Sequence, residues 1–170
     1  MGIQCFDDVV PYNIRETIWH CSVSADLKLG WEDSNQPEKY DLNIHSELGM
    51  ADLEPTGILP YFKKCTDETE WFKNKKLHRV VLNLVRSNDV HYIHHHPDKH
   101  VLLYYVNLDW RDGWYGETLF YDPYDIEKIS FTSVYKPGRI ILFDGSIPHA
   151  IRPQSIKAPK FRFSLSLFFE

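Results

Sequence analysis

The sequence predicts a mainly β protein of the sandwich or jelly-roll class. Between residues 78 and 169, roughly eight short strand-like segments follow one another, each bounded by residues that favour turns. Aromatic residues make up 15% of the chain, which suits a β-rich core. The length of 170 residues suits one domain, so we expect residues 1–170 to form a single unit with its core at roughly 78–169.

The N-terminal part of the chain is expected to supply a few flanking helices. Residues 12–21 carry Ile14 and Ile18 at helical spacing, and Pro11 suits the start of a helix. A second helix is expected to follow Pro60. The remaining expectations here are an extended lead-in at 6–11, strands at 22–30 and 40–46, and a polar loop at 31–40.

The strands proper are expected to begin near residue 78. They are predicted at 78–85, 101–107, 117–121, 130–135, 139–143, 150–153 and 161–169. The last one alternates strictly, with Phe161 and Phe163 on one face and Arg162 and Ser164 on the other. Its polar face is either a solvated edge or a carboxylate clamp, because a guanidinium forms a bidentate pair with a carboxylate and a nearby hydroxyl adds a donor.

Five of the nine histidines fall within residues 91–100. Imidazole is a common ligand of first-row metals, and residues i and i+2 of a strand point to the same face. His96 and Asp98 would therefore reach one ion from a single strand, and so would His94 and His96. A further ligand is expected from His149, which opens a strand after the turn at Asp144-Gly145.

These motifs together resemble the 2-oxoglutarate- and Fe(II)-dependent oxygenases, in particular the prolyl 4-hydroxylase-like branch. The chain shows a His-x-Asp, a late histidine and an Arg-x-Ser in the family's order. Residues 104–110 resemble that branch's Tyr-Leu-Asn-x-x-Trp segment, residues 115–120 its Gly-Gly-Glu segment, and residues 137–143 the strand before the distal histidine. The similarity covers roughly residues 80 to 169. Tyr115 departs from the pattern, because the family often has glycine there.

The resemblance implies a double-stranded β-helix that binds Fe(II) and uses 2-oxoglutarate as cosubstrate. It implies that Arg162 pairs with the distal carboxylate of 2-oxoglutarate, while Tyr105 and Ser164 add hydrogen bonds. It also implies hydroxylation of a peptidyl prolyl or small-molecule substrate with release of succinate and CO2, and no catalytic residue beyond the metal ligands. The alternative is a cupin-like or lectin-like jelly roll that binds metal or sugar without oxidation, which needs the histidines but neither Arg162 nor Ser164.

Two registers are open for the metal ligands. The first uses His96, Asp98 and His149, the two imidazoles and one carboxylate of non-haem Fe(II) oxygenases. The second uses His94, with His96 where the carboxylate normally stands, and leaves residues 97–100 as a four-residue turn. We favour the first because a carboxylate offsets part of the iron's charge. The second needs three neutral imidazoles, which would put ordinary hydroxylation in doubt.

Composition limits the kinds of binding partner and the cellular compartment that we expect. The formal net charge of −5 argues against a nucleic-acid-binding module, whose footprint is basic. No apolar run is long enough to span a membrane, and the N-terminus lacks the features of a signal peptide. The three cysteines fit neither a zinc site nor a disulfide framework, so we expect a cytoplasmic protein. The oligomeric state is left open.

Overall fold

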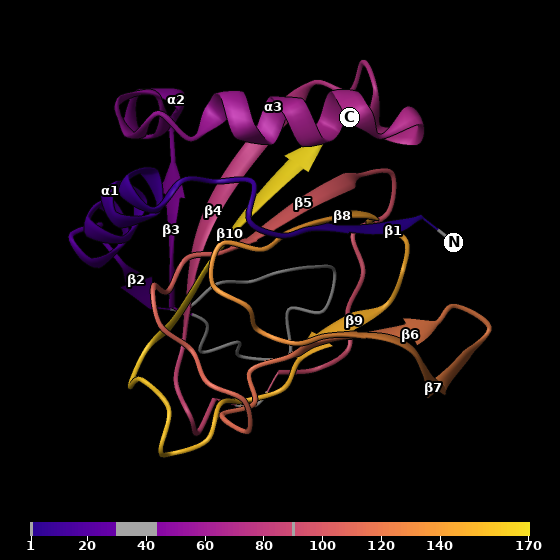
Figure 1. Ribbon diagram of the computed structural model, residues 1–170. Helices are drawn as coiled ribbons and strands as arrows, with labels where there is room; N and C mark the ends of the chain where they lie inside the picture. Colours follow the sequence, from indigo (N-terminus) through magenta and orange to yellow (C-terminus); the bar gives the residue numbers. More distant parts are fainter. Residues whose placement is uncertain (1, 30–43, 90) are drawn as a thin grey trace.

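Two antiparallel sheets form the body of the molecule in the computed structural model, which describes residues 2–29, 44–89 and 91–170 (Figure 1). The larger sheet has seven strands, in the order β1 (Ile3–Phe6), β8 (Ile140–Asp144), β5 (His100–Tyr105), β10 (Arg162–Phe169), β4 (Leu77–Val85), β3 (Ile44–Leu48) and β2 (Lys28–Leu29). The smaller sheet has the order β7 (Asp125–Ser133), β6 (Thr118–Asp122) and β9 (His149–Ile151). This arrangement confirms the predicted fold class.

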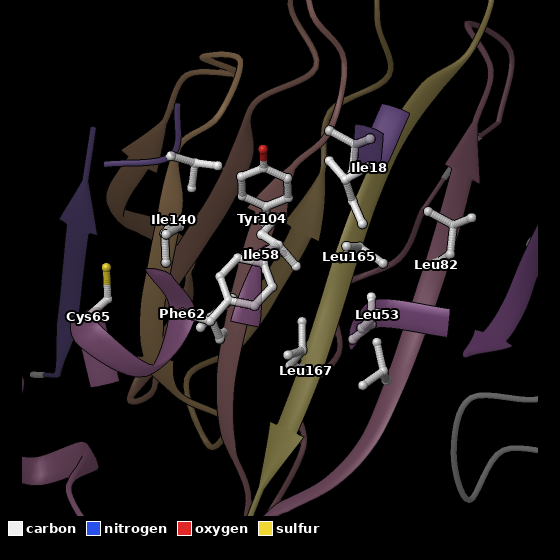
Figure 2. Close-up of a cluster of buried hydrophobic side chains, with 14 of the residues drawn as sticks. Ile18, Leu53, Ile58, Phe62, Cys65, Leu82, Tyr104, Ile140, Leu165 and Leu167 are labelled. Atoms are coloured by element: carbon white, nitrogen blue, oxygen red, sulfur yellow. The ribbon is translucent and has the colours of Figure 1, made fainter. Parts of the chain in front are cut away.

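Short helices cover the outer face of the larger sheet (Figure 1). They are α1 (Tyr12–Val23), α2 (Met50–Leu53) and α3 (Leu59–Glu68), with 3₁₀ turns at Glu54–Thr56 and Glu70–Phe72. Figure 2 shows their apolar side chains against those of the strands, with Ile18, Leu53 and Phe62 on the helical side and Leu82 and Leu165 on the sheet. All five of these side chains are buried, so this layer forms a core of its own.

A second core lies between the two sheets. Phe120 of β6 packs against Phe143 of β8, with ring centroids 5.0 Å apart. Leu103 and Tyr105 of β5 are buried in the same cluster. Because strand side chains alternate, each central strand sends one set of residues to the helices and the other set into this interior.

Strand β10 illustrates the alternation. Phe163, Leu165 and Leu167 face the helices, while Arg162 and Ser164 belong to the opposite set and are only 0% and 1% exposed. The strand pairs with β4 on one side and β5 on the other. Its polar face is therefore not the solvated edge that was one interpretation of the sequence.

Several element boundaries differ from the sequence expectations. Helix α1 runs on to Val23, where the sequence suggested a strand from 22. The buried Ser22 hydroxyl is accommodated in the helix by donating to the Ile18 carbonyl at 2.8 Å. Strand β7 begins at Asp125 rather than 130, directly after the hairpin turn at 123–124. Strand β1 (Ile3–Phe6) begins before the extended lead-in expected at 6–11 and overlaps it only at Phe6.

The predicted loop at 31–40 and the first part of the strand at 40–46 lie outside the described residues. Strands β1 and β3 precede residue 78 and add to the larger sheet. Within the described residues, no helix is long and apolar enough to cross a membrane.

Candidate metal and cosubstrate site

Three histidines converge between the sheets. Nitrogen atoms of His94, His96 and His149 all lie within 4.8 Å of one another. The expected ligand strand around 91–98 is not a regular strand. It is an irregular segment joined to β9 by one antiparallel bridge, in which the amides of His94 and His149 donate to each other's carbonyls at 3.0 and 2.8 Å. That bridge brings the two distant parts of the sequence together.

Backbone carbonyls orient two of the rings. The Nδ1 atom of His149 lies 2.8 Å from the Ile147 carbonyl oxygen, and that of His94 lies 3.3 Å from the Tyr92 carbonyl oxygen. A carbonyl only accepts, so Nδ1 carries the proton in both rings and Nε2 keeps its lone pair. This is the arrangement in which histidine binds a metal.

Burial and like charges favour the neutral form of His149. Desolvation, followed by the charges of His94 and His96, lowers the pKa of this imidazole well below its ordinary value. A neutral imidazole is the form that coordinates a cation, so the ring is ready for a metal at neutral pH.

Gly145 lets the histidine segment approach β8. Its carbonyl accepts from the His96 amide at 2.7 Å, and its amide donates to the Lys99 carbonyl at 2.9 Å. A Cβ at this position would lie 2.5 Å from the His96 oxygen and 2.7 Å from the Lys99 oxygen. The glycine of the Asp144-Gly145 turn is therefore needed for close contact of two backbones.

Asp98 lies apart from this group. It sits in the turn that follows His96, is exposed, and has φ of 61°. Among the described residues, the cluster that could hold a metal contains His94, His96 and His149 and not Asp98. His95 points to solvent, and His100 packs against Trp71 and Phe72.

Arg162 is fully buried in the same interior. Its Nε donates to the Gly116 carbonyl at 2.9 Å, and its Nη1 donates to the Ser164 hydroxyl at 3.4 Å. Its guanidinium carbon lies 5.2 Å and 4.8 Å from the ring centroids of Tyr105 and Tyr135. Its Nη2 has no hydrogen-bond partner. Burial lowers the pKa of this guanidinium, although an arginine keeps its charge in a protein.

A buried guanidinium with an unused donor is costly unless an anion joins it. No ion pair involves Arg162 among the residues that the structure describes. The local arrangement therefore suits a carboxylate ligand.

A cavity of about 80 Å³ lies between the histidines and the face of β10. Its polar lining consists of Asn83, His91, Tyr92, His94, His96, Thr118, His149, Ser164 and Ser166. Tyr105 does not line it. Its hydroxyl donates to the Thr118 hydroxyl at 2.8 Å, and its ring lies beneath the guanidinium of Arg162. Of the three residues expected to bind cosubstrate, Ser164 lines the cavity, while Arg162 and Tyr105 lie behind it.

Sequence reasoning missed part of this lining, including Asn83 and His91. Asn83 is the one polar residue in the apolar run at 80–85, and this pattern could have marked it as a candidate site residue. His91 was seen only as part of the histidine window. Its Nε2 has no hydrogen-bond partner, and burial, then the charge of Arg162, lowers its pKa to about 4. His91 is therefore a neutral group facing the cavity at physiological pH.

Tyr115 stands where the resembling family often has glycine. Its φ of 62° is in the left-handed region, which favours glycine. Its ring is exposed and lies 3.7 Å from the guanidinium carbon of Arg152.

Solved structures with the same architecture include a Trichoplax adhaerens prolyl hydroxylase in complex with a hypoxia-inducible factor peptide, with TM-score 0.70 and 14% identity over 99% of this chain and 83% of the other. A Pseudomonas putida prolyl-4-hydroxylase matches with TM-score 0.69 and 13% identity over 99% and 92%. The chain has the fold of the 2-oxoglutarate-dependent oxygenases. This confirms the expected double-stranded β-helix.

The non-haem α-ketoglutarate-dependent epimerase SnoN of nogalamycin biosynthesis shares this fold too, with TM-score 0.73 and 11% identity over 99% of this chain and 77% of the other. Neither a protein-family profile nor a curated protein sequence matches the chain. Because hydroxylases and an epimerase have this fold in common, the fold alone does not give the substrate.

Proposed function

We propose that the protein is a 2-oxoglutarate- and Fe(II)-dependent oxygenase that hydroxylates a small-molecule or peptidyl, including prolyl, substrate. One observation carries the proposal. A three-histidine cluster and a fully buried arginine with an unused donor lie within the interior of this oxygenase fold. The first suits a divalent metal and the second a carboxylate, which are the two things that such an enzyme must hold.

His94, His96 and His149 are the proposed iron ligands, in the second of the two registers. Imidazole suits Fe(II), and the carbonyl contacts of His94 and His149 leave Nε2 available in both rings. Asp98 is assigned to the turn. Its exposure and its left-handed backbone support this assignment over the His-x-Asp register.

Arg162 is the proposed partner of the distal carboxylate of 2-oxoglutarate. Nη2 would donate to the carboxylate, while Nε stays on the Gly116 carbonyl and holds the guanidinium plane. Ser164 offers a hydroxyl at the cavity wall. Tyr105 would position the guanidinium by packing its ring against it, because the Tyr105 hydroxyl already donates to Thr118.

Iron and 2-oxoglutarate, when both are bound, supply the oxidising chemistry, and the cosubstrate leaves as succinate and CO2. The chain's part is to orient both and to exclude water. Apolar residues complete the cavity wall, among them Val101, Leu103, Phe143 and Phe168. Electrostatic contacts are stronger in such a dry site than in water.

A second candidate is a jelly roll that binds metal without oxidation. The observation in its favour is the ligand set itself, because three neutral imidazoles and no carboxylate meet in the described cluster. The two candidates differ in their need for Arg162, which a simple metal-binding protein has no reason to bury without a partner.

The test is 2-oxoglutarate turnover by the Fe(II)-loaded protein, followed as succinate release with and without candidate peptides and small carboxylic acids. Succinate formation that requires iron supports the oxygenase. Iron binding without any effect of 2-oxoglutarate supports the non-oxidative candidate.

A matched pair of variants tests the register. His94→Ala is expected to lose iron and activity, whereas Asp98→Ala should keep both. The opposite result would return Asp98 to the ligand set.

A further inference from the structure

Among the described residues of the cavity wall, His91 is the imidazole that the proposed function leaves without a role. It lines the cavity with His94, His96 and His149 but does not belong to their cluster. Its Nε2 atom is buried and has no hydrogen-bond partner. A buried polar atom without a partner costs free energy, so a ligand that supplies the missing partner is favoured.

The Nε2 atom of His91 is free to act as a donor. The ring is uncharged at neutral pH, because burial and then the charge of Arg162 lower its pKa to about 4. A neutral imidazole carries one proton, on either Nδ1 or Nε2. In His94 and His149, carbonyl oxygens 3.3 and 2.8 Å away hold that proton on Nδ1. No carbonyl does so for His91 among the described residues, so Nε2 can carry the proton.

The neighbouring groups offer donors too. Ser164 lines the cavity with His91, and its oxygen accepts from Nη1 of Arg162 at 3.4 Å, which leaves the Ser164 proton available to donate. Nη2 of Arg162 has no partner. The charge of Glu117 also acts on Arg162, but Glu117 does not line the cavity, and its buried Oε2 accepts from none of these donors. Donors beside a buried positive charge suit a negatively charged acceptor.

We propose that the Nε2–H group of His91 donates to the distal carboxylate of 2-oxoglutarate, beside Arg162. The inference rests on the proposed function and adds one residue to the cosubstrate contacts. One carboxylate oxygen takes the proton of His91, and the other remains for Ser164 and Arg162, since a carboxylate accepts several hydrogen bonds. A neutral ring donates without repelling the charge of Arg162, as an imidazolium would.

The experiment compares 2-oxoglutarate with 2-oxopentanoate on the Mn(II)-loaded full chain by titration calorimetry. The two acids share their chain length and their 2-oxo acid end, and 2-oxopentanoate has a methyl group in place of the distal carboxylate. The ratio of their dissociation constants therefore measures the contacts to that carboxylate. With two charge-assisted donors, we expect the unaltered protein to prefer 2-oxoglutarate roughly a hundredfold.

A matched pair of variants isolates the contribution of His91. His91→Leu removes both ring nitrogens and should weaken 2-oxoglutarate roughly tenfold while leaving 2-oxopentanoate unchanged. His91→Gln keeps an amide N–H near the position of Nε2 and should restore most of the loss. His95→Leu makes the same exchange at an exposed histidine and should change neither constant. Equal weakening of both acids in His91→Leu would show that the ring only supports the cavity wall, and would overturn the inference.

A measurement on the unaltered protein covers the case of a variant that does not fold. With Zn(II) bound and histidine labelled at its ring nitrogens, the Nε2–H resonance of His91, assigned through its own ring, should shift with 2-oxoglutarate and not with 2-oxopentanoate. An Nε2 without a proton in the 2-oxoglutarate complex would contradict the proposal.

The two proposals fail in different ways. Equal affinity of the unaltered protein for the two acids would count against the distal-carboxylate site, and with it against the proposed function. A preference for 2-oxoglutarate that survives undiminished in a folded His91→Leu protein would remove only the role of His91.

Discussion

Arg162 and the histidine cluster lie within the same interior but are held by different kinds of backbone. Arg162 belongs to an eight-residue strand with a neighbour on each side, where alternation fixes the direction of every side chain. His94 and His96 lie on an irregular segment tied to β8 and β9 by a few backbone hydrogen bonds. The proposed cosubstrate end, at Arg162, is thus set by regular strand geometry. The proposed metal end, at the histidines, is set by particular backbone contacts that include Gly145.

Removing His149 is the strongest test of the metal end. His149→Ala is expected to abolish iron binding, because this ring is common to both ligand registers and is the buried member of the cluster. Iron content per chain would be measured after reconstitution, with circular dichroism as the check on folding. His95→Ala removes an exposed neighbouring histidine and should keep full iron content. Iron retained by a folded His149→Ala protein would dismiss the proposed centre.

Removing Arg162 tests the proposed cosubstrate contact on β10 without changing the histidine cluster. Charge-assisted hydrogen bonds contribute about 1.5–3 kcal/mol each, so Arg162→Ala should weaken 2-oxoglutarate binding by roughly tenfold or more. Iron content should be unchanged, because none of the proposed iron ligands is on β10. Titration calorimetry on the Mn(II)- or Co(II)-loaded protein measures the affinity. Lys160→Ala, which removes an exposed charge next to the same strand, should have no effect. An unchanged affinity in Arg162→Ala would refute the assignment.

The contrast between the regular strand β10 and the irregular histidine segment also explains which parts of the site could be predicted from the sequence. The period-two pattern of residues 161–169 correctly placed Arg162 and Ser164 on one face and the apolar residues on the other. It did not show that β10 is central, because strand neighbours depend on the whole topology. Both faces are therefore buried.

The histidine end resisted prediction for a different reason. Both registers placed two ligands on one strand, where i and i+2 share a face: His96 and Asp98 in the first, His94 and His96 in the second. The segment is instead irregular, and its turn sends Asp98 to solvent. Ligand chemistry favoured Asp98 and turn geometry favoured His94, and the close approach at Gly145 depends on contacts between residues far apart in the chain.

Gly145→Ala tests whether that close approach holds the metal end in place. The new Cβ would meet two backbone oxygens that belong to the histidine segment, and neither is free to move like a side chain. We expect a loss of about 3 kcal/mol in the free energy of unfolding, at the upper end for overpacking, together with weaker iron binding. Urea denaturation and iron titration measure the two effects. Gly49→Ala is the control, because its Cβ would have ordinary contacts of 3.5 Å or more. If Gly145→Ala and Gly49→Ala lost the same unfolding free energy and iron affinity, the close approach at Gly145 would not hold the histidine segment in place.

His91 lines the same cavity as the histidine cluster and is affected by the charge of Arg162. Its protonation is expected to have the smallest effect on stability among these tests. Burial, then the charge of Arg162, lowers its pKa to about 4, whereas an unfolded histidine titrates near 6.5. The unfolded chain therefore binds a proton more readily between these values, so this group's contribution to stability is complete above pH 6.5 and is lost as the pH falls toward 4. For the metal-free protein, we expect His91 to account for a loss of about 1–2 kcal/mol in the free energy of unfolding between pH 7 and pH 5.

His91→Gln should make the free energy of unfolding less dependent on pH by that amount. Some dependence should remain, because burial lowers the pKa of His149 as well. Denaturant midpoints at pH 7, 6 and 5 for the two proteins measure the difference, with His78→Gln, an exposed histidine on β4, as the control. Parallel pH profiles for His91→Gln and the unaltered protein would show that His91 does not face the charge of Arg162 in a dry cavity.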